Sequence, residues 1–83
     1  MNKVTHFDKW VKLCEENNSI LFRLEGSRGN GLYKVTREFE YDNRVHYSSP
    51  VYIIWCNFDT WTATTSLFEA YHIWDKYRQS ESA

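Results

Sequence analysis

Glu69 and His72 have the spacing of a metal-ligand pair. A helix would place this carboxylate and this imidazole, three positions apart, on one face, as in the Glu-x-x-His ligands of di-iron bundles. Such a site needs matching ligands from other helices, and the N-terminal segment offers only Glu15 and Glu16 near its end. We therefore predict no metal and no cofactor, and we expect Glu69 and His72 to lie on the solvated face of a helix.

The two cysteines, Cys14 and Cys56, are the candidate nucleophiles. Cys14 falls on an apolar helical stripe and Cys56 ends the most apolar run of the chain, where burial favours the neutral, unreactive thiol. Neither the CxxC spacing nor a zinc-ligand spacing is present. The N-terminal residues lack a signal core, and no apolar run approaches the roughly 18 residues of a membrane span. We expect a cytoplasmic protein with no catalytic residues and no membrane partner.

The charges of the chain are balanced. Ten Lys and Arg residues stand against eleven Asp and Glu residues, so the formal net charge is -1 and no global field draws the chain to nucleic acid. Binding of RNA would need a local patch, and five basic residues would share an edge of the sheet if the central hairpin forms: Arg23, Arg28, Lys34, Arg37 and Arg44. Glutamates interleave with them, which is also typical of scattered surface charge.

Apolar residues with helical spacing open the chain. Phe7, Trp10, Val11 and Cys14 follow the i, i+3, i+4, i+7 pattern, and Thr5 with Asp8 resembles a capping box, so a helix is predicted over residues 5–17. Alternating apolar residues in 19–25 and 32–41 predict two strands. All three glycines lie between these strands, in residues 26–31, which predicts a hairpin with positive φ angles.

The second half of the chain predicts further strands and a helix. Residues 42–44 are a turn signal, and residues 48–50 interrupt the chain before the run 51–56, which is apolar on both faces and typical of a central strand. Residues 61–64 suit a short additional strand. Ser66 and Glu69 then form a second capping box. The helix that follows has an apolar stripe, and residues 79–83 are expected to fray; the stripe is Leu67, Ala70, Tyr71, Trp74 and Tyr77.

These elements predict one domain over residues 1–83. The order helix, three or four antiparallel strands, helix fits an α+β two-layer sandwich with both helices on one sheet face. The same order resembles the double-stranded-RNA-binding domain, although residues 65–69, where that family has its phosphate-binding lysines, contain no base. Residues 28–35 resemble in part the octapeptide of RRM proteins, with Leu32 and Val35 where that family places rings.

Aromatic residues are unusually frequent, with four Trp, six Tyr and five Phe. Helical and strand periodicity assigns one group to the core: Phe7, Trp10, Phe22, Phe68, Tyr71, Trp74 and Tyr77. The surplus lies on the strands, where exposed rings suit a binding hot spot. The predicted protein-binding residues are Tyr33, Tyr41, Tyr52, Trp55 and Trp61.

We therefore predict a small non-enzymatic protein that binds a macromolecular partner stoichiometrically, as an inhibitor or adaptor. Its aromatic, motif-free character resembles that of accessory proteins encoded by phages and other mobile elements, which implies a host enzyme, toxin or defence complex as target. The alternative is an RNA-binding module that uses the five basic residues with neighbouring tyrosines. A domain of 83 residues buries only roughly 60% of its unfolded surface, so a homodimer is also expected.

Overall fold

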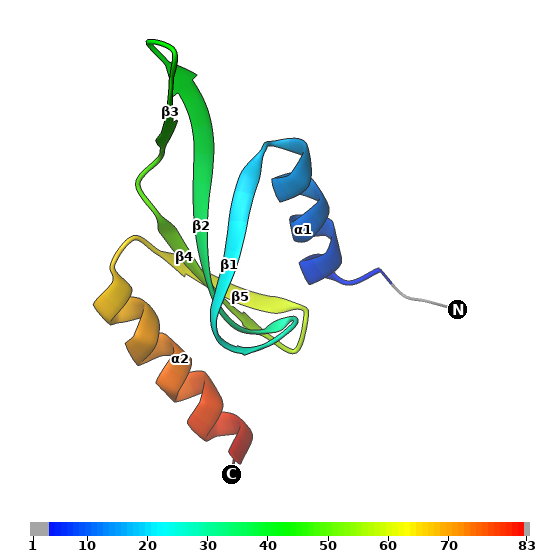
Figure 1. The fold of residues 1–83 in the computed structure, drawn as a ribbon. Helices are drawn as coiled ribbons and strands as arrows, with labels where there is room; N and C mark the ends of the chain where they lie inside the picture. Colours follow the sequence, from blue (N-terminus) through cyan, green and yellow to red (C-terminus); the bar gives the residue numbers. More distant parts are fainter. Residues whose placement is uncertain (1–3, 83) are drawn as a thin grey trace.

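The computed structural model describes residues 4–82, and within them the chain forms two helices and five strands (Figure 1). The elements are α1 (His6–Glu16), β1 (Ser19–Ser27), β2 (Asn30–Tyr41), β3 (Arg44–Tyr47), β4 (Val51–Cys56), β5 (Thr60–Thr64) and α2 (Leu67–Ser82). The predicted α+β class, with an antiparallel sheet between an N-terminal and a C-terminal helix, is confirmed. Helix α2 extends to Ser82. The fraying predicted for residues 79–83 stays a prediction.

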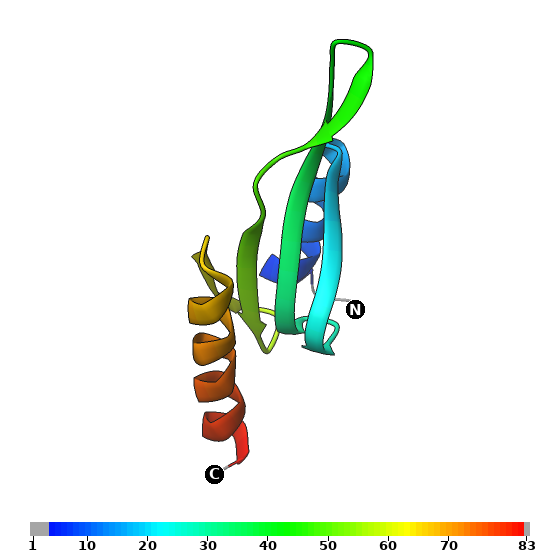
Figure 2. The same ribbon diagram turned by 60° about the vertical axis from the view of Figure 1, so that its left-hand side comes forward.

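The sheet has the order β1-β2-β4-β5, and the long strand β2 organises it. The first half of β2 pairs with β1 on one side and with β4 on the other, through contacts such as Val35 with Leu21 and with Val51. Its second half pairs only with β3, from Glu38 with Tyr47 to Tyr41 with Arg44. This part, residues 38–47, is called the arm. Figures 1 and 2 show that it projects beyond the four-stranded sheet.

The strand β3 is not among the predicted elements, although its turn is. Asp42 and Asn43 have φ values of 54° and 59°, and such left-handed pairs are the usual connection of a two-residue hairpin. The predicted glycine hairpin is also present, since Gly26 and Gly29 have φ values of 85° and 78°. A four-residue strand has too short an alternating pattern to be distinguished from a loop.

The two helices cover opposite faces of the sheet, so the expectation that both lie on one face is wrong. Leu32 and Ile54 pack in one cluster with residues of α2, whereas their neighbours Tyr33 and Trp55 pack in another with Phe7 of α1. Successive side chains of a strand point to opposite faces. Because β2 and β4 carry apolar residues at consecutive positions, each face needs its own cover, and the layers are helix, sheet, helix (Figure 2).

On the α1 face, Phe7 is the centre of an aromatic cluster with Tyr33 and Trp55. The predicted capping box begins this helix, because Thr5 Oγ1 accepts a hydrogen bond from Asp8 N (3.2 Å) and the Asp8 carboxylate accepts one from Thr5 N (3.3 Å). The backbone N–H of Phe7 donates to the carbonyl of Phe58 (2.9 Å). These contacts join the start of α1 to the β4–β5 turn.

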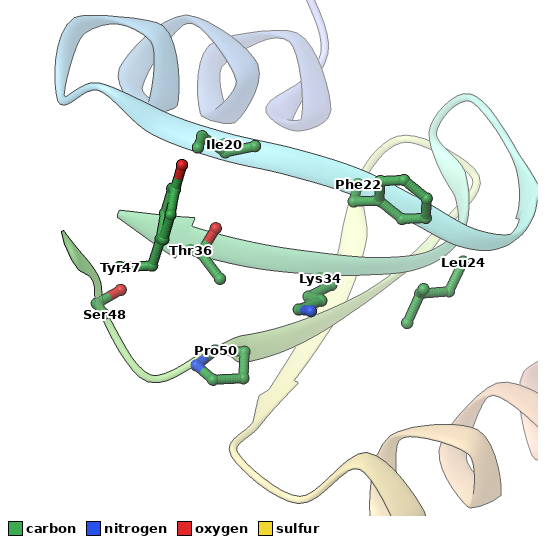
Figure 3. Close-up of a pocket in the computed structure, with 8 residues that line it drawn as sticks. All are labelled: Ile20, Phe22, Leu24, Lys34, Thr36, Tyr47, Ser48 and Pro50. Carbon is green, nitrogen blue, oxygen red and sulfur yellow. The ribbon is translucent and has the colours of Figure 1, made fainter. Parts of the chain in front are cut away.

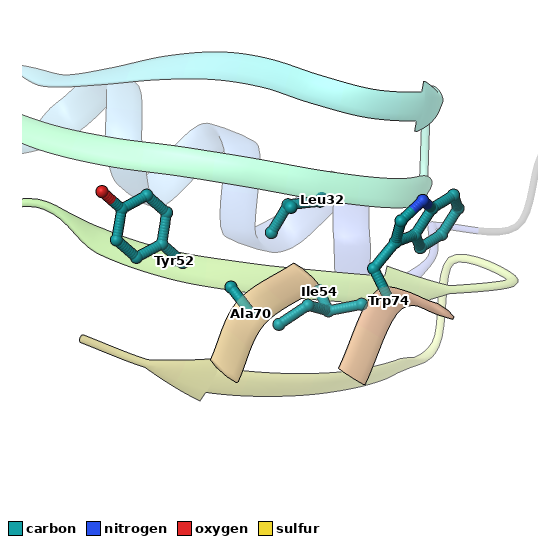
Figure 4. Packing of buried hydrophobic residues seen from close by; sticks show 5 residues of the cluster. All are labelled: Leu32, Tyr52, Ile54, Ala70 and Trp74. Atoms are coloured by element: carbon teal, nitrogen blue, oxygen red, sulfur yellow. The ribbon is translucent and has the colours of Figure 1, made fainter. Parts of the chain in front are cut away.

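On the α2 face, the core is formed by Leu32, Tyr52, Ile54, Ala70 and Trp74 (Figure 4). Ser66 Oγ caps α2 by accepting from Glu69 N (3.2 Å), as predicted. Two residues of the predicted stripe, Leu67 and Tyr71, are exposed, and so is Phe68. The reason is that α2 contacts the sheet with only one of its sides. That side consists of Ala70, Ile73, Trp74 and Tyr77.

Candidate functional site

The two helices are offset from each other, and each leaves part of its sheet face uncovered. The backbone of α1 lies beside β1, and its Phe7 and Trp10 side chains reach Trp55 of β4, whereas α2 packs against β2, β4 and β5. On the α1 face the uncovered part lies over β5 and the adjoining edge of β4, and on the α2 face it lies over β1 and the adjoining half of β2. Each uncovered part forms a groove, and apolar side chains line both.

The groove on the α1 face is called the tryptophan groove. It has a volume of about 300 Å³ and is lined by His6, Lys9, Trp10, Leu13, Ile53, Trp55 and Trp61. The Trp55 and Trp61 rings are cross-strand neighbours with centroids 6.1 Å apart, and Trp10 lies 5.4 Å from Trp55. Trp61 is 54% exposed and Leu13 is also exposed, while Trp55 is only 2% exposed. The groove therefore combines a rigid indole wall with accessible apolar edges.

The indole N–H of Trp55 is unusual, because Nε1 is buried without a hydrogen-bond partner among the described residues. Leaving a buried donor unpaired costs about 1–3 kcal/mol. Buried polar groups in native proteins are nearly always paired, so the Trp55 N–H is an exception within this groove lining.

Polar side chains form the rim of this groove. Lys9 and His6 line it from α1, and His6 Nδ1 lies 3.4 Å from the Asp59 carboxylate. An ion pair joins the helix to the β1–β2 hairpin, with Arg28 donating to Asp8 over 2.8 Å. This guanidinium and the Thr5 hydroxyl hold the pKa of Asp8 below its ordinary value. The Arg28 guanidinium also lies 5.1 Å from the centre of the Phe7 ring, within the range of a cation–π contact.

The groove on the α2 face is called the β1 groove (Figure 3). It has a volume of about 530 Å³ and is lined by Ile20, Phe22, Leu24, Lys34, Thr36, Tyr47, Ser48 and Pro50. Phe22 is 62% exposed, and Ile20 and Tyr47 are exposed as well. Lys34 lies on the central strand between these apolar groups and makes no ion pair with any described residue. The groove is thus apolar with one unpaired positive charge.

The predicted protein-binding residues are divided between core and surface. Tyr33, Tyr52 and Trp55 are buried, so the prediction that they form a contact surface is wrong for these three. Only Tyr41, on the arm, and Trp61, in the tryptophan groove, are exposed. The helices occupy the middle of both sheet faces, and rings on β2 and β4 are consequently covered.

Several exposed residues differ from the sequence prediction. Phe22, in the β1 groove, and Phe68, outside both grooves, were predicted to be buried, and the groove residues Leu13 and Tyr47 were not singled out. These residues have the sequence pattern of ordinary buried positions. Whether a helix covers each of them depends on the offset between the two helices. Val45 to Tyr47 alternate after a turn signal, but so few residues do not distinguish a strand from a loop.

The five predicted basic residues do not form one patch. Arg23 is paired in register with Tyr33, so it lies on the α1 face, and Arg37 shares that face by strand alternation. Lys34 lies in the β1 groove on the opposite face, Arg28 pairs with Asp8, and Arg44 is at the end of the arm.

Other chemistry considered from the sequence finds little support in the geometry. Glu69 and His72 are both exposed on α2, and within residues 4–82 no three His, Cys, Asp or Glu side chains gather closely enough to hold a metal ion. Burial raises the pKa of the Cys14 thiol, which favours its neutral form. Over the same residues, neither helix has the length and apolar character needed to cross a membrane.

In comparisons with known proteins, no family model, no curated protein and no solved structure matches the chain.

Proposed function

We propose that the chain is a small non-enzymatic protein that binds a partner protein stoichiometrically, as an inhibitor or adaptor, through the tryptophan groove. The observation that carries this proposal is the exposed pair Trp61 and Leu13 beside the buried wall of Trp55. Tryptophan is among the residues most enriched at binding hot spots, and such residues sit against rigid, desolvated surroundings.

The groove favours a partner segment with an apolar side chain next to an acceptor. An apolar side chain would enter between Trp61 and Leu13, and burial of its surface against them would favour the complex. Lys9 at the rim favours an acidic neighbour.

The proposal also includes the target class, the compartment and the self-association that the sequence led us to expect. The target would be a host enzyme, toxin or defence complex, as for accessory proteins of phages and other mobile elements. The compartment would be the cytoplasm, in keeping with a sequence of only two, widely separated cysteines. Association with a second copy is also proposed, because a domain of this size buries little of its surface alone. RNA binding by the basic residues is the alternative; the ion pair of Arg28 with Asp8 and the place of Lys34 on the opposite face leave fewer of them for one RNA contact.

Capture experiments with matched variants test the proposal. The tagged chain is used to capture proteins from a lysate of its source cell, beside Trp61→Ala, Leu13→Ala and the control Phe68→Ala, which truncates an 86% exposed ring on α2 outside both grooves. We expect a protein captured in a fixed molar ratio by the wild type and the control, and reduced at least tenfold with Trp61→Ala.

Nuclease treatment and salt distinguish the RNA alternative. Protein contact through indole rings should be insensitive to nuclease and nearly insensitive to salt, whereas RNA binding weakens steeply with salt through counterion release. Capture that is equal for Trp61→Ala and Phe68→Ala, capture that disappears with nuclease, or no specific capture at all would contradict the proposal.

A further inference from the structure

One face of the arm carries rings together with positive charges. Phe39 and Tyr41 alternate along β2 on the side of the sheet where α1 lies, and Arg37 precedes them on the same side at the base of the arm. Register partners share a face, which adds His46 beside Phe39 and Arg44 beside Tyr41. These five residues are called the aromatic face.

The rings of the aromatic face are in contact with one another and accessible. The ring centroid of His46 lies 5.6 Å from that of Phe39, in a stacked arrangement, and 6.0 Å from that of Tyr41. His46 Nε2 also lies 3.2 Å from the Tyr41 carbonyl oxygen. The arm projects beyond both helices (Figure 1), and Tyr41 is 70% exposed and Phe39 48% exposed. The three rings therefore form one open aromatic surface.

Hydrogen bonds fix the backbone beneath these rings. At the base of the arm, Arg37 N donates to Ser48 Oγ and Ser48 N donates to the Arg37 carbonyl, both over 2.8 Å. Four register pairs of β2 and β3 follow, and the left-handed turn at Asp42 and Asn43 closes the hairpin. A surface that is ordered before binding loses less conformational entropy when a ligand binds. The aromatic face is in this sense preorganised.

The charge of the aromatic face is positive. The acidic residues of the arm are Glu38 and Glu40, which alternate onto the opposite side of β2, and Asp42, which lies in the turn. Arg37 and Arg44 are both exposed, and neither forms an ion pair with another residue in the described range 4–82. The face thus presents two guanidinium groups without counter-charges beside its rings, and it complements an anionic ligand.

Exposed rings and guanidinium groups complement the two parts of a nucleic acid strand. Bases stack on aromatic side chains, and phosphates pair with arginine. Phe39 and Tyr41 are two positions apart, about 7 Å along the strand, so each ring can stack with a different base. Stacking requires unpaired bases, and this mode is typical of RNA recognition, whereas duplexes are read through base edges in a groove.

We propose that the aromatic face of the arm binds single-stranded RNA. Phe39 and Tyr41 stack with bases, and Arg37 and Arg44 pair with phosphates at the two ends of the face. The contact uses only these two of the five basic residues considered from the sequence. It shares no residue with the tryptophan groove, so it does not depend on the protein contact proposed there.

Fluorescence anisotropy of the full chain with a labelled single-stranded RNA of about 12 nucleotides tests this proposal. At about 50 mM salt we expect a dissociation constant below about 100 μM, and the same RNA annealed into a duplex should compete at least about fivefold more weakly. Each phosphate contact of a single strand contributes about −0.7 to the slope of log K against log salt, so two contacts predict about −1.4.

Matched variants assign the binding to one face of the arm. Tyr41→Ala should weaken binding about fivefold or more, because one stacking ring is lost. The control Tyr47→Ala removes a 61% exposed ring from the opposite face of the same hairpin and should bind like the wild type, as should Trp61→Ala in the tryptophan groove. Arg44→Gln should reduce the salt slope by about 0.7.

Circular dichroism should show all four variants folded. No binding of the single strand at about 100 μM protein, equal affinities for Tyr41→Ala and Tyr47→Ala, a salt slope that Arg44→Gln leaves unchanged, or a duplex that competes as well as the single strand would overturn the proposal.

Discussion

Replacing Phe7 by alanine should remove a large part of the stability of this domain. Phe7 is 2% exposed, and its ring centroid lies 5.3 Å from Trp55, 5.5 Å from Tyr33 and 5.8 Å from Phe58. The contacts with Trp55 and Phe58 are edge-to-face, which is a favoured geometry for aromatic pairs. The ring therefore joins α1 to β2, β4 and the β4–β5 turn, and no neighbouring side chain can fill its place without moving.

The expected loss follows from the burial of the ring. Truncation of a buried Phe to Ala typically costs 3–5 kcal/mol, because transfer energy is lost and a cavity remains, so we expect about 3–5 kcal/mol here. A domain of 83 residues has a total stability of roughly 4–12 kcal/mol. The thermal midpoint should accordingly fall by about 12–40 °C, or the chain should be unfolded at room temperature.

Urea unfolding followed by far-ultraviolet circular dichroism measures this loss. The control is Phe68→Ala, which removes the same group from an exposed position and should change the free energy of unfolding by less than about 0.5 kcal/mol. Phe7→Leu, which keeps an apolar side chain, should lose less than Phe7→Ala. A loss below about 1.5 kcal/mol for Phe7→Ala, or equal losses for Phe7→Ala and Phe68→Ala, would refute the placement of Phe7 at the centre of the α1 cluster.

Three further substitutions test local features of the fold. Thr5→Ala removes the N-cap hydroxyl of α1 and should cost about 1 kcal/mol in urea unfolding, and an unchanged midpoint would argue against the capping box. Gly29→Ala should cost more than about 1 kcal/mol, since φ is +78° and an added methyl group would overlap the Phe58 ring; a neutral result would contradict this turn geometry. Asp8→Asn addresses pH: because Arg28 lowers the pKa of Asp8 from 3.8, the carboxylate stabilises the fold above about pH 4 and this contribution disappears as the pH falls through the lowered pKa. Thermal midpoints measured between about pH 2 and 6 should therefore show a shallower acid limb for Asp8→Asn than for the wild type, and equal limbs would count against the ion pair.

The local elements of this fold are readable from short stretches of sequence because their signals are local. Thr5 and Asp8 indicate the start of α1, and the structure contains the reciprocal hydrogen bonds that this pattern predicts. The glycine segment predicts a hairpin because glycine adopts positive φ without strain, and Gly26 and Gly29 do so. By contrast, β3 could not be predicted from its sequence, because four residues do not establish a period. Its pairing with the end of β2 depends on the tertiary structure.

Which strand residues are exposed on the candidate surfaces could not be predicted from short stretches of sequence. Phe22 and Trp55 both belong to alternating or apolar runs, and nothing in those runs separates them. In the structure Phe22 is 62% exposed and Trp55 is 2% exposed. The difference arises because α1 covers the sheet beside Trp55 on one face, while on the other face α2 stops short of β1. Exposure of a strand residue thus depends on a helix that can be 50 residues away in the chain.

The sequence by itself determined the α+β class, the order of the helices and main strands, the capping of both helices and the glycine hairpin, because spacing and residue type act on near neighbours. Only the tertiary structure decided that the helices cover opposite faces, that they are offset, and that β2 extends into an arm. Those features follow from long-range packing, in which consecutive apolar residues such as Ile54 and Trp55 each require a cover on their own side. The two grooves, and with them the contact proposed for the tryptophan groove, result from that packing.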